Sequence, residues 1–560
     1  MRCVLDVRSG TPQAGATRTA SLMSLGVLLA IGGIIGDRHA ADAADGRICV
    51  EIAARVGMDF VGASGTTFAS SPLGPVMQRT MGNGAAVGDY DDDGDLDVLL
   101  LGQRGQDDRL YRNDLMPGGS LAFTDVTRIA GVGDTALSRV AQFADLDGDG
   151  LLDLVVINDT DPADPAEPSR LYRNQGDGTL ADVTEGSGFH PAGYIVGGLS
   201  LADPDTDGDL DIYISYWTEQ LGGDPALRDA KGAYPATNAF YRNDGAFRFT
   251  DISLESGLGG VNLDAFSSLF ADFDGDRDLD LFVAMDHRED LYYEQFEPMR
   301  WRNRWSDVGA THKGNDMGLA IADLGSDGEL DMFATNITDP EGKLGTGGGN
   351  VLVTFERGAQ GTRIVDHPAA AVVEDTGWGW GAVFLDIDLD GALDLYAVQG
   401  MDEFVGDLSP TVRDGRSRLF LGSRRGFSPS KGTGCEIPGD QRAVVAFDAD
   451  RDGDQDLLVT QVGLPVRLLR NETPKGRSVT VDLGAGGAAA PGSRVTVEVD
   501  GRRVTQVVVA GGSYLSGPPM EAVFGLGTAK QADLVEVVWA DGRTTRLTDV
   551  PSGSIVRPAP

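Results

Sequence analysis

A nine-residue acidic pattern, Asp-x-Asp-x-Asp-Gly-x-x-Asp, occurs in seven copies along the chain, and an apolar run follows each copy. Carboxylates at positions 1, 3, 5 and 9 of a tight loop can converge on one hard cation, and calcium accepts about six to eight oxygen ligands. Glycine at position 6 allows the sharp turn that such a loop needs. The copies begin at Asp89, Asp145, Asp203, Asp272, Asp323, Asp386 and Asp448. The spacing therefore predicts a calcium ion in each loop.

The predicted ligands are the aspartates of these loops together with the residue at position 7. Position 7 varies between acidic and apolar residues, which indicates that its backbone carbonyl rather than its side chain binds the metal. The predicted ligands in the first three loops are Asp89, Asp91, Asp93, Asp95, Asp97, Asp145, Asp147, Asp149, Leu151, Asp153, Asp203, Asp205, Asp207, Asp209 and Asp211. Those in the last four loops are Asp272, Asp274, Asp276, Asp278, Asp280, Asp323, Asp327, Asp331, Asp386, Asp388, Asp390, Ala392, Asp394, Asp448, Asp450, Asp452, Asp454 and Asp456.

Two of the copies depart from the pattern. The fourth has Arg277 at position 6, where glycine is expected. The fifth has Gly325 at position 3, so it lacks one of its four carboxylates. We expect the fifth loop to bind calcium weakly or not at all, which gives about five to seven ions in the protein.

Two alternatives to a propeller-type calcium loop can be weighed from the sequence. An EF-hand needs a bidentate Glu at loop position 12 and flanking helices. Position 12 is Leu100, Val156 and Ile214 in the first three copies, and the runs around it have the composition of short strands. Acidic, solvated turns without metal are the other alternative, which the recurrence of seven copies in one register disfavours.

Two further short patterns recur between the acidic loops. One is LYRN at Leu110–Asn113, and the other is FTDVT at Phe123–Thr127. Each repeat then contains four strands in a unit of about 50–70 residues, which is typical of a propeller blade. The prediction is an all-β protein in which residues 48–471 form a seven-bladed β-propeller. The last repeat lacks its fourth strand, and Ile48–Phe60 resembles that strand, so we expect the amino-terminal segment to complete the ring.

Residues 472–560 lack the acidic loop. Val479–Leu483, Arg494–Val499 and Val504–Val509 alternate between apolar and polar residues, as strands do. We expect a small, β-rich C-terminal domain. Its role is left open by the sequence.

The amino terminus has the features of an export signal. Arg2, Arg8 and Arg18 precede an apolar stretch at 22–35, and Ala41-Asp42-Ala43 offers a small-x-small cleavage site. Residues 1–43 are therefore predicted to be a signal peptide, with an uncleaved anchor as the alternative. The mature protein would have no membrane span. It would be a secreted, extracellular monomer, or a periplasmic one in a Gram-negative host, where calcium is plentiful enough to fill weak sites.

Charge and cysteine content agree with export. The formal net charge of −40 argues against nucleic acid or an anionic membrane as the partner. Removal of the signal would leave Cys49 and Cys435, an even number, which is compatible with one disulfide or with two free buried thiols. Both cysteines are expected on outer strands of adjacent blades, where a bond is geometrically possible.

The acidic repeats resemble the FG-GAP or VCBS repeats of integrin α-chain propellers and of many secreted bacterial proteins. The C-terminal region, with the motif before the sixth loop, resembles the ASPIC/UnbV domain of the cartilage acidic protein family. The matching motifs are Trp378-Gly-Trp380-Gly, Gly492–Val495, Gly511–Ser516, Phe524–Gly527 and Val537–Trp539. The resemblance implies an exported, calcium-loaded, seven-bladed propeller, and it implies no known reaction.

No pattern in the sequence identifies a catalytic centre. The five histidines lack metal-binding spacing, and neither a nucleophile elbow nor a phosphate-binding loop occurs. The first hypothesis is therefore an interaction or adhesion scaffold for a protein or glycan ligand outside the cell. The alternative is a calcium-dependent propeller enzyme that acts on polysaccharide, as a lyase or hydrolase.

Two long insertions are candidate ligand surfaces. One spans Trp217–Asn238, and the other, Asp286–Trp305, is rich in aromatic residues. Exposed aromatic rings could stack on sugars or anchor a protein partner. The alternative is that these rings pack between blades, and the sequence does not decide between the two.

Overall fold

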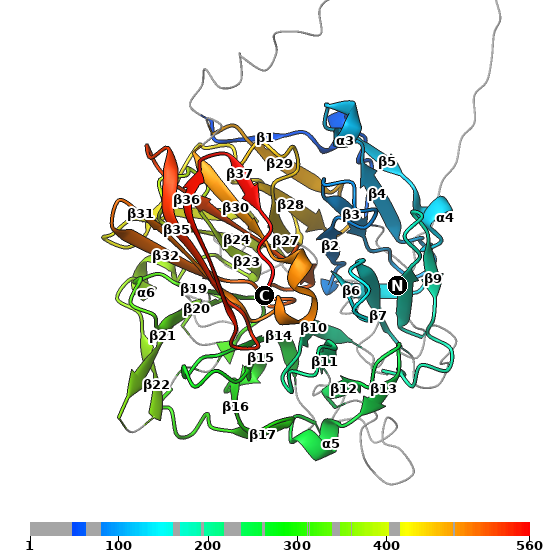
Figure 1. Ribbon diagram of the computed structural model, residues 1–560, viewed down its shortest axis with the longest axis horizontal. Helices are drawn as coiled ribbons and strands as arrows, with labels where there is room; N and C mark the ends of the chain where they lie inside the picture. Colours follow the sequence, from blue (N-terminus) through cyan, green and yellow to red (C-terminus); the bar gives the residue numbers. More distant parts are fainter. Residues whose placement is uncertain are drawn as a thin grey trace, which may run out of the picture. The chain divides into compact units, whose positions relative to one another are not determined.

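A computed structural model describes the chain from residue 47 onward, with gaps (Figure 1). The described ranges are 47–62, 80–160, 168–191, 195–217, 237–259, 264–310, 312, 314–338, 348–359, 361–401, 415–473 and 477–560. The predicted signal peptide and most of the Trp217–Asn238 insertion lie outside these ranges, so neither prediction is tested by the structure.

The repeating unit is a four-stranded antiparallel sheet. In the first unit these strands are β2 (Ala85–Gly88), β3 (Asp97–Leu100), β4 (Arg109–Asn113) and β5 (Phe123–Asp125). The acidic loop joins the first two strands, LYRN forms the third and FTDVT begins the fourth. The apolar run that follows the acidic loop forms β3, which is buried over its whole length because sheets cover both of its faces.

Seven sheets of this form occur in the described part of the chain, and we number them in chain order. Sheet 2 contains β6 (Leu137–Ala144), β7 (Asp153–Asp159), β8 (Arg170–Asn174) and β9 (Leu180–Asp182). Sheet 3 contains β10 (Val196–Ala202), β11 (Asp211–Tyr216), β12 (Ala239–Asn243) and β13 (Phe249–Asp251). Sheet 4 contains β14 (Ala265–Ala271), β15 (Asp280–Arg288), β16 (Leu291–Glu297) and β17 (Arg300–Asn303), with β18 (Gly314–Asn315) paired to β15. Sheet 5 contains β19 (Leu319–Asp323), β20 (Leu330–Ala334), β21 (Val351–Gly358) and β22 (Gly361–Asp366). Sheet 6 contains β23 (Gly379–Leu385), β24 (Asp394–Gln399), β25 (Arg418–Leu421) and β26 (Ser428–Pro429). Sheet 7 contains β27 (Gln441–Phe447), β28 (Asp456–Gln461), β29 (Arg467–Asn471) and β1 (Cys49–Glu51).

The first strands of the sheets contact one another in a closed cycle. The order is β2, β6, β10, β14, β19, β23 and β27, and β27 in turn contacts β2. Apolar side chains fill the space between neighbouring sheets; Ala86 and Leu99 of sheet 1, for example, share one core cluster with Ala141 and Leu154 of sheet 2. This arrangement is a β-propeller, so the predicted all-β propeller fold is confirmed.

The amino-terminal strand completes the ring, as expected from the repeat count. Strand β1 pairs antiparallel with β29, with Cys49 opposite Asn471, and the two strands lie side by side in Figure 1. Cys49 and Cys435 form a disulfide between sheet 7 and the segment that follows β26. Of the two alternatives for these cysteines, the bonded one is therefore correct.

The C-terminal segment is β-rich, and it joins the propeller through two strand pairs. Its strands are β30 (Ser478–Asp482), β31 (Arg494–Val499), β32 (Arg502–Val507), β33 (Ser516–Gly517), β34 (Glu521–Gly525), β35 (Gln531–Val538), β36 (Thr544–Pro551) and β37 (Ser554–Val556). Strand β32 pairs with β19, which extends sheet 5 into an eight-stranded sheet, and β33 pairs in parallel with β2.

One loop of this segment, residues 510–518, reaches the first strand of all seven sheets. Hydrogen bonds connect it to the first strands of most sheets, through Ala85, Gln142, Leu201, Leu319, Ala382 and Val444. Gly512 lies against Leu269 of the remaining first strand, β14. Because first strands line the axis of a propeller, we call this loop the axial plug.

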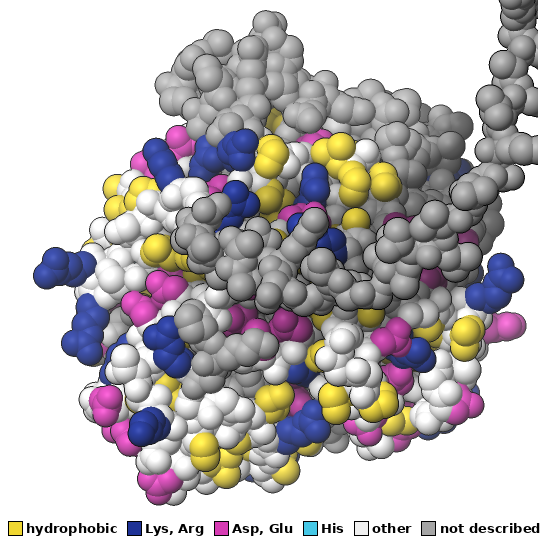
Figure 2. Space-filling view, turned by 90° about the horizontal axis from the view of Figure 1, so that it is seen from above, with side chains coloured by type: hydrophobic (Ala, Val, Ile, Leu, Met, Phe, Trp, Pro, Cys, Tyr) yellow, Lys and Arg dark blue, Asp and Glu magenta, His cyan; other side chains and the backbone are white. Residues whose placement is uncertain are grey.

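Helices in the described residues are short. They are η2 (Ala53–Val56), α3 (Leu115–Gly118), α4 (Thr127–Ala130), α5 (Ser253–Ser256), α6 (Ala370–Val373) and η6 (Gly484–Ala489), which is interrupted at Gly487. In the described ranges, no helix has the length and apolar character needed to cross a membrane. On the described part of the face in Figure 2, Asp and Glu side chains are interspersed with Lys and Arg.

Candidate metal centres

Each acidic loop connects the first and second strands of its sheet. In at least four of the loops, three carboxylate oxygens lie within 4.8 Å of one another. The groups are Asp89, Asp91 and Asp97; Asp145, Asp147 and Asp153; Asp203, Asp205 and Asp207; and Asp272, Asp274 and Asp276. The convergence predicted from the spacing is therefore present in the structure.

Backbone hydrogen bonds hold each loop in this shape. In the first loop, the Asp89 carboxylate accepts from the N–H groups of Asp93 at 3.1 Å and Gly94 at 3.0 Å. The Asp97 carboxylate accepts from Tyr90 N at 3.0 Å and from Asn113 N at 2.8 Å. Positions 1 and 9 thus fold the loop and orient their remaining lone pairs toward its centre.

Two positions in every loop adopt the left-handed conformation. Position 6 does so as expected, with φ of 100° at Gly94, and Arg277 adopts φ of 80° despite its side chain. Position 4 is also left-handed, which the sequence did not predict because only two of its seven residues are glycine. The position 4 residues are Asp92, Gly148, Thr206, Gly275, Ser326, Leu389 and Arg451.

Several carboxylate oxygens in the loops are buried and have no hydrogen-bond partner among the described residues. They are Asp91 Oδ1, Asp95 Oδ1, Asp205 Oδ1, Asp211 Oδ2, Asp278 Oδ1, Asp386 Oδ1 and both oxygens of Asp454. A buried carboxylate oxygen without a partner is costly. Among them, Asp91, Asp205, Asp211 and Asp386 are at positions 1, 3 and 9, where carboxylate ligands are predicted. A bound cation would satisfy their oxygens, so the residues present fit a metal ion.

Burial also perturbs the acidity of the loops. In the metal-free chain, burial is the main cause that raises the pKa of Asp89, Asp203 and Asp448 to about 7, and neighbouring carboxylates add to it. Burial likewise raises the pKa of Asp394 to about 8. The loops therefore hold more negative charge than they can solvate, which a cation would neutralise.

The two departures from the pattern differ in their effect. The fourth loop still brings Asp272, Asp274 and Asp276 together in spite of Arg277. In the fifth loop, Asp323 keeps its two backbone hydrogen bonds, while the hydroxyl of Thr354 donates to Asp331 at 2.5 Å. Weak or absent binding at the fifth loop stays a prediction.

An arginine that the sequence analysis missed enters the second loop. Arg173 Nε lies 2.7 Å from Asp147 Oδ2, and its Nη2 lies 3.2 Å from Asp149 Oδ2. The equivalent arginine of sheet 1, Arg112, instead donates to Asp114, two residues later in the chain. In sheet 2, the residue two positions after Arg173 is Gln175, which has no negative charge. Loss of that local acid explains why Arg173 turns to the loop.

The asparagine of LYRN has a role that the sequence analysis also missed. Asn174 Nδ2 donates to the carbonyl of Tyr90, at position 2 of the preceding acidic loop, at 2.7 Å. Asn243 repeats this bond to Leu146 at 2.9 Å. The recurrence of Asn at the end of each LYRN-type motif is the feature of the sequence from which this role could have been predicted. We call such a bond the loop clasp, because it joins an acidic loop to the next sheet.

Comparison with known families finds matches in two regions of the chain. A family model for FG-GAP-like repeats matches residues 89–156 and 145–214, and one for ASPIC and UnbV matches residues 485–557. The chain carries FG-GAP-like repeats and a C-terminal ASPIC/UnbV domain. The finer resemblance to the cartilage acidic protein family stays a prediction. No curated protein matches the chain.

Solved structures with a similar chain path are distant. A lectin of Agrocybe aegerita, described as specific for non-reducing terminal N-acetylglucosamine, is 16% identical, with a TM-score of 0.36 and coverage of 70% of this chain and 94% of the lectin. Rhamnogalacturonan lyase YesW is 14% identical, with a TM-score of 0.36 and 76% of each chain covered. BBS1N, in its complex with ARL6DN, is 10% identical, with a TM-score of 0.38 and coverage of 75% and 98%. Likeness at this level decides nothing about a ligand or a reaction.

The ASPIC/UnbV domain contacts the acidic loops directly. Gly525 N donates to Asp386 Oδ2 at 3.0 Å, and Arg502 Nη1 donates to the carbonyl of Asp390 at 2.7 Å. Arg494 donates to the carbonyls of Asp272 and Gly328 in the fourth and fifth loops. The domain therefore docks on the same loops in which metal ions are predicted to bind.

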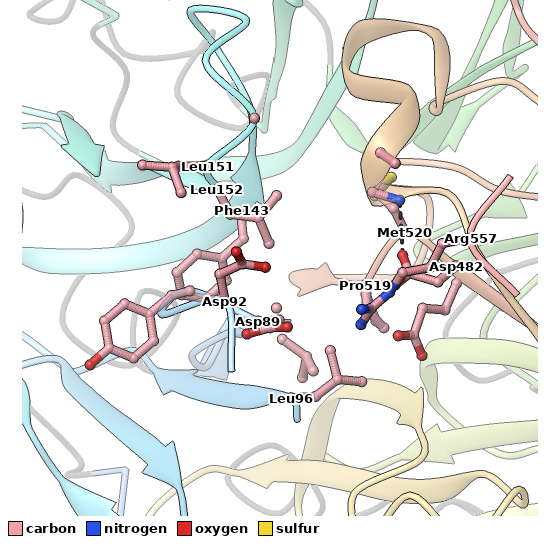
Figure 3. A pocket seen from close by; sticks show the side chains of 17 residues that line it. Asp89, Asp92, Leu96, Phe143, Leu151, Leu152, Asp482, Pro519, Met520 and Arg557 are labelled. Carbon is pink, nitrogen blue, oxygen red and sulfur yellow. Dashed lines mark hydrogen bonds and ion pairs between the residues drawn. The ribbon is translucent and has the colours of Figure 1, made fainter. Parts of the chain in front are cut away.

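A cavity of about 200 Å³ opens between the first two acidic loops and the C-terminal segment (Figure 3). Asp89 and Asp92 lie on one side of it, while Asp482 and Arg557, 2.7 Å apart, lie on the other. The remainder is lined mainly by apolar side chains, among them Phe143, together with Glu521. The cavity is large enough for a small group and is bordered by a predicted metal ligand.

The aromatic-rich insertion is mostly internal. Tyr292, Tyr293, Trp301 and Trp305 are at most 5% exposed, because they pack between sheets 3, 4 and 5. Phe296, which is 47% exposed, is the exception. Of the two alternatives for this stretch, packing is correct for four of the five rings.

Proposed function

We propose that this protein is an exported, calcium-binding, seven-bladed β-propeller that serves as an interaction scaffold for a protein or glycan ligand outside the cell. The observation that carries the proposal is the set of buried, unpartnered carboxylate oxygens in loops whose backbone is already folded around them. Such loops are prepared for a hard cation, and oxygen-only ligands favour calcium.

The chain's own residues would bind the ion in a fixed manner. Carboxylates at positions 1, 3, 5 and 9 and the carbonyl at position 7 would supply oxygen ligands, and position 9 also holds the loop to the third strand. Calcium would supply positive charge that offsets the repulsion between the carboxylates. The loop clasp would transmit that order to the next sheet, because Asn174 of sheet 2 and Asn243 of sheet 3 each bond a carbonyl inside the acidic loop of the preceding sheet.

An interaction role agrees with the repeat type and with the acidic composition. The axial plug occupies the line along which the seven first strands meet, so ligand contacts would lie on the loops at the faces of the propeller. The aromatic insertion, which is largely buried, contributes little to such a surface.

The first experiment is calcium binding by the mature chain, measured by isothermal titration calorimetry. We expect at least five ions per chain. Asp91→Asn should remove about one ion. The matched change Asp92→Asn should remove none, because the Asp92 side chain is exposed and its backbone has a left-handed conformation that Asn adopts readily. Equal stoichiometry for the two variants would contradict the metal assignment.

The scaffold role has its own test. Purified mature chain should be retained on a glycan array or on an extracellular-matrix protein panel in millimolar calcium, and released by chelator. Retention that is indifferent to calcium, or no retention on either panel, would count against a calcium-dependent scaffold.

A further inference from the structure

A cluster of a different kind lies at the far end of β15 from the fourth acidic loop. Asp290 follows β15, while His312 and Asp316 flank β18, which pairs with the same end of β15. His312 Nε2 and one carboxylate oxygen from each aspartate lie within 4.8 Å of one another. The sequence analysis gave these three residues no role, because 26 positions separate the first from the last.

Each carboxylate in the cluster is anchored by one oxygen. Asp290 Oδ1 accepts from Met285 N at 2.8 Å, and Asp316 Oδ1 accepts from Asn336 Nδ2 at 2.5 Å. The other oxygens face the histidine: His312 Nε2 lies 2.9 Å from Asp290 Oδ2 and 3.8 Å from Asp316 Oδ2. Three ligand atoms are therefore held toward one point by their surroundings, as in metal sites.

Burial makes this arrangement costly without a further group. The side chains of Asp290 and Asp316 are 1% and 0% exposed, and that of His312 is 16% exposed. Asp316 Oδ2 accepts no hydrogen bond from a nitrogen donor among the described residues, and His312 Nε2, 3.8 Å away, is too distant to supply one. The carboxyls of Asp290 and Asp316 can bond each other when they share a proton. When both are deprotonated, the two buried charges require a cation.

We propose that Asp290, His312 and Asp316 bind one divalent first-row transition-metal ion, with Zn²⁺ as the expected ion. Two carboxylates and a neutral imidazole balance a dication, and an imidazole ligand selects zinc over calcium. Two ligands at about 2.0–2.1 Å from a tetrahedral zinc lie about 3.3 Å apart, which the observed distances of 2.9 and 3.8 Å bracket.

Neighbouring side chains fix the positions of the proposed ligands. The Trp305 ring meets the His312 ring edge-on at a centroid distance of 5.0 Å, which restricts the imidazole. Asn336 follows β20 of sheet 5, so the site joins sheets 4 and 5. Three protein ligands leave a fourth position for water or a ligand, and the partly exposed histidine provides a route for the ion.

The test is zinc binding by the whole mature chain in calcium sufficient to fill the acidic loops. After equilibrium dialysis against Zn²⁺, we expect about one zinc per chain by elemental analysis, and an anomalous difference map at the zinc edge should place it between the three side chains. No retained zinc, or zinc located only in the acidic loops, would overturn the proposal.

Matched variants separate ligation from nonspecific binding. His312→Gln should lower zinc affinity more than about 100-fold, whereas His190→Gln, at an exposed histidine, should leave it unchanged. Asp316→Asn keeps the size of the side chain and should also lose zinc. The alternative is that Asp316 is protonated, donates a hydrogen bond to Asp290 and binds no metal. In that case the Asp316→Asn variant will bind zinc with the affinity of the wild type, and the proposal fails. Thermal melts in calcium verify that each variant is folded.

Discussion

The side-chain amide of Asn113 donates to the carbonyl of Ala449 at 2.9 Å, although 336 positions separate the two residues. Asn113 ends the third strand of sheet 1, and Ala449 is position 2 of the acidic loop of sheet 7. This bond is therefore a loop clasp that joins sheet 7 to sheet 1, where the ring closes. Asn471 repeats it with Ile387 at 2.8 Å, and Gln295 does so with Pro204 at 3.0 Å.

Removal of the clasp at the ring closure should destabilise the whole propeller. Asn113→Ala leaves two buried carbonyls, those of Leu96 and Ala449, without their amide donor. We expect a loss of about 1–3 kcal/mol in the free energy of unfolding, measured by urea denaturation in calcium. Gln175→Ala, which removes an exposed amide, is the control and should change it by less than about 0.5 kcal/mol. Equal effects of both changes would argue against a structural role for the clasp.

The metal-free chain should lose stability as the pH rises. The pKa values of Asp89, Asp203 and Asp448 lie at about 7 in the folded chain against an ordinary 3.8, because of burial and then repulsion from neighbouring carboxylates. The folded chain then binds protons more tightly than the unfolded chain. That contribution to stability is complete below about pH 4 and is lost as the pH passes through about 7.

Thermal melts in EDTA at pH 5 and pH 8 check this sign. We expect the lower Tm at pH 8, and we expect excess calcium to reduce or reverse the difference, because calcium binds the deprotonated loops. A higher Tm at pH 8 in EDTA would show that the loop carboxylates are not strained in the metal-free state.

Arg173 should compete with calcium for the second loop. Its ion pairs with Asp147 and Asp149 occupy oxygens that an ion would use. Arg173→Gln should therefore raise calcium affinity at one site, by up to about fivefold, since a half-exposed ion pair is worth little. Arg112→Gln is the matched control, because Arg112 bonds Asp114 outside the first loop. Calorimetric titration of both variants with calcium tests this prediction. A lower calcium affinity of the Arg173→Gln variant than of the wild type would contradict competition by Arg173.

The axial plug should contribute strongly to stability. Tyr514 is fully buried, donates its hydroxyl to the carbonyl of Met81 at 3.0 Å, and has its ring centroid 4.8 Å from that of Trp380. Tyr514→Ala should lower the free energy of unfolding by about 3–5 kcal/mol, measured by urea denaturation in calcium. Phe296→Ala, at a ring that is 47% exposed, provides the comparison and should cost far less. A small effect at Tyr514 would mean that the plug is dispensable.

The sequence by itself determined what depends on neighbours along the chain. The convergence of Asp89, Asp91 and Asp97 depends mainly on hydrogen bonds within the nine-residue loop, so their spacing was sufficient to predict it. The order of strands and the pairing of the amino-terminal strand with the last sheet follow from the period of the repeats. The left-handed conformation at position 4 of the acidic loops was not predicted, because residues such as Asp92 and Thr206 adopt it there and only glycine at that position would have indicated it.

Tertiary structure alone decided the contacts between distant parts of the chain. The clasp from Asn113 to Ala449, the plug around Tyr514 and the meeting of Asp290 with Asp316 depend on how sheets pack and on which side chains burial leaves unpaired. No spacing in the sequence encodes those distances, because they arise from the packing of many residues at once.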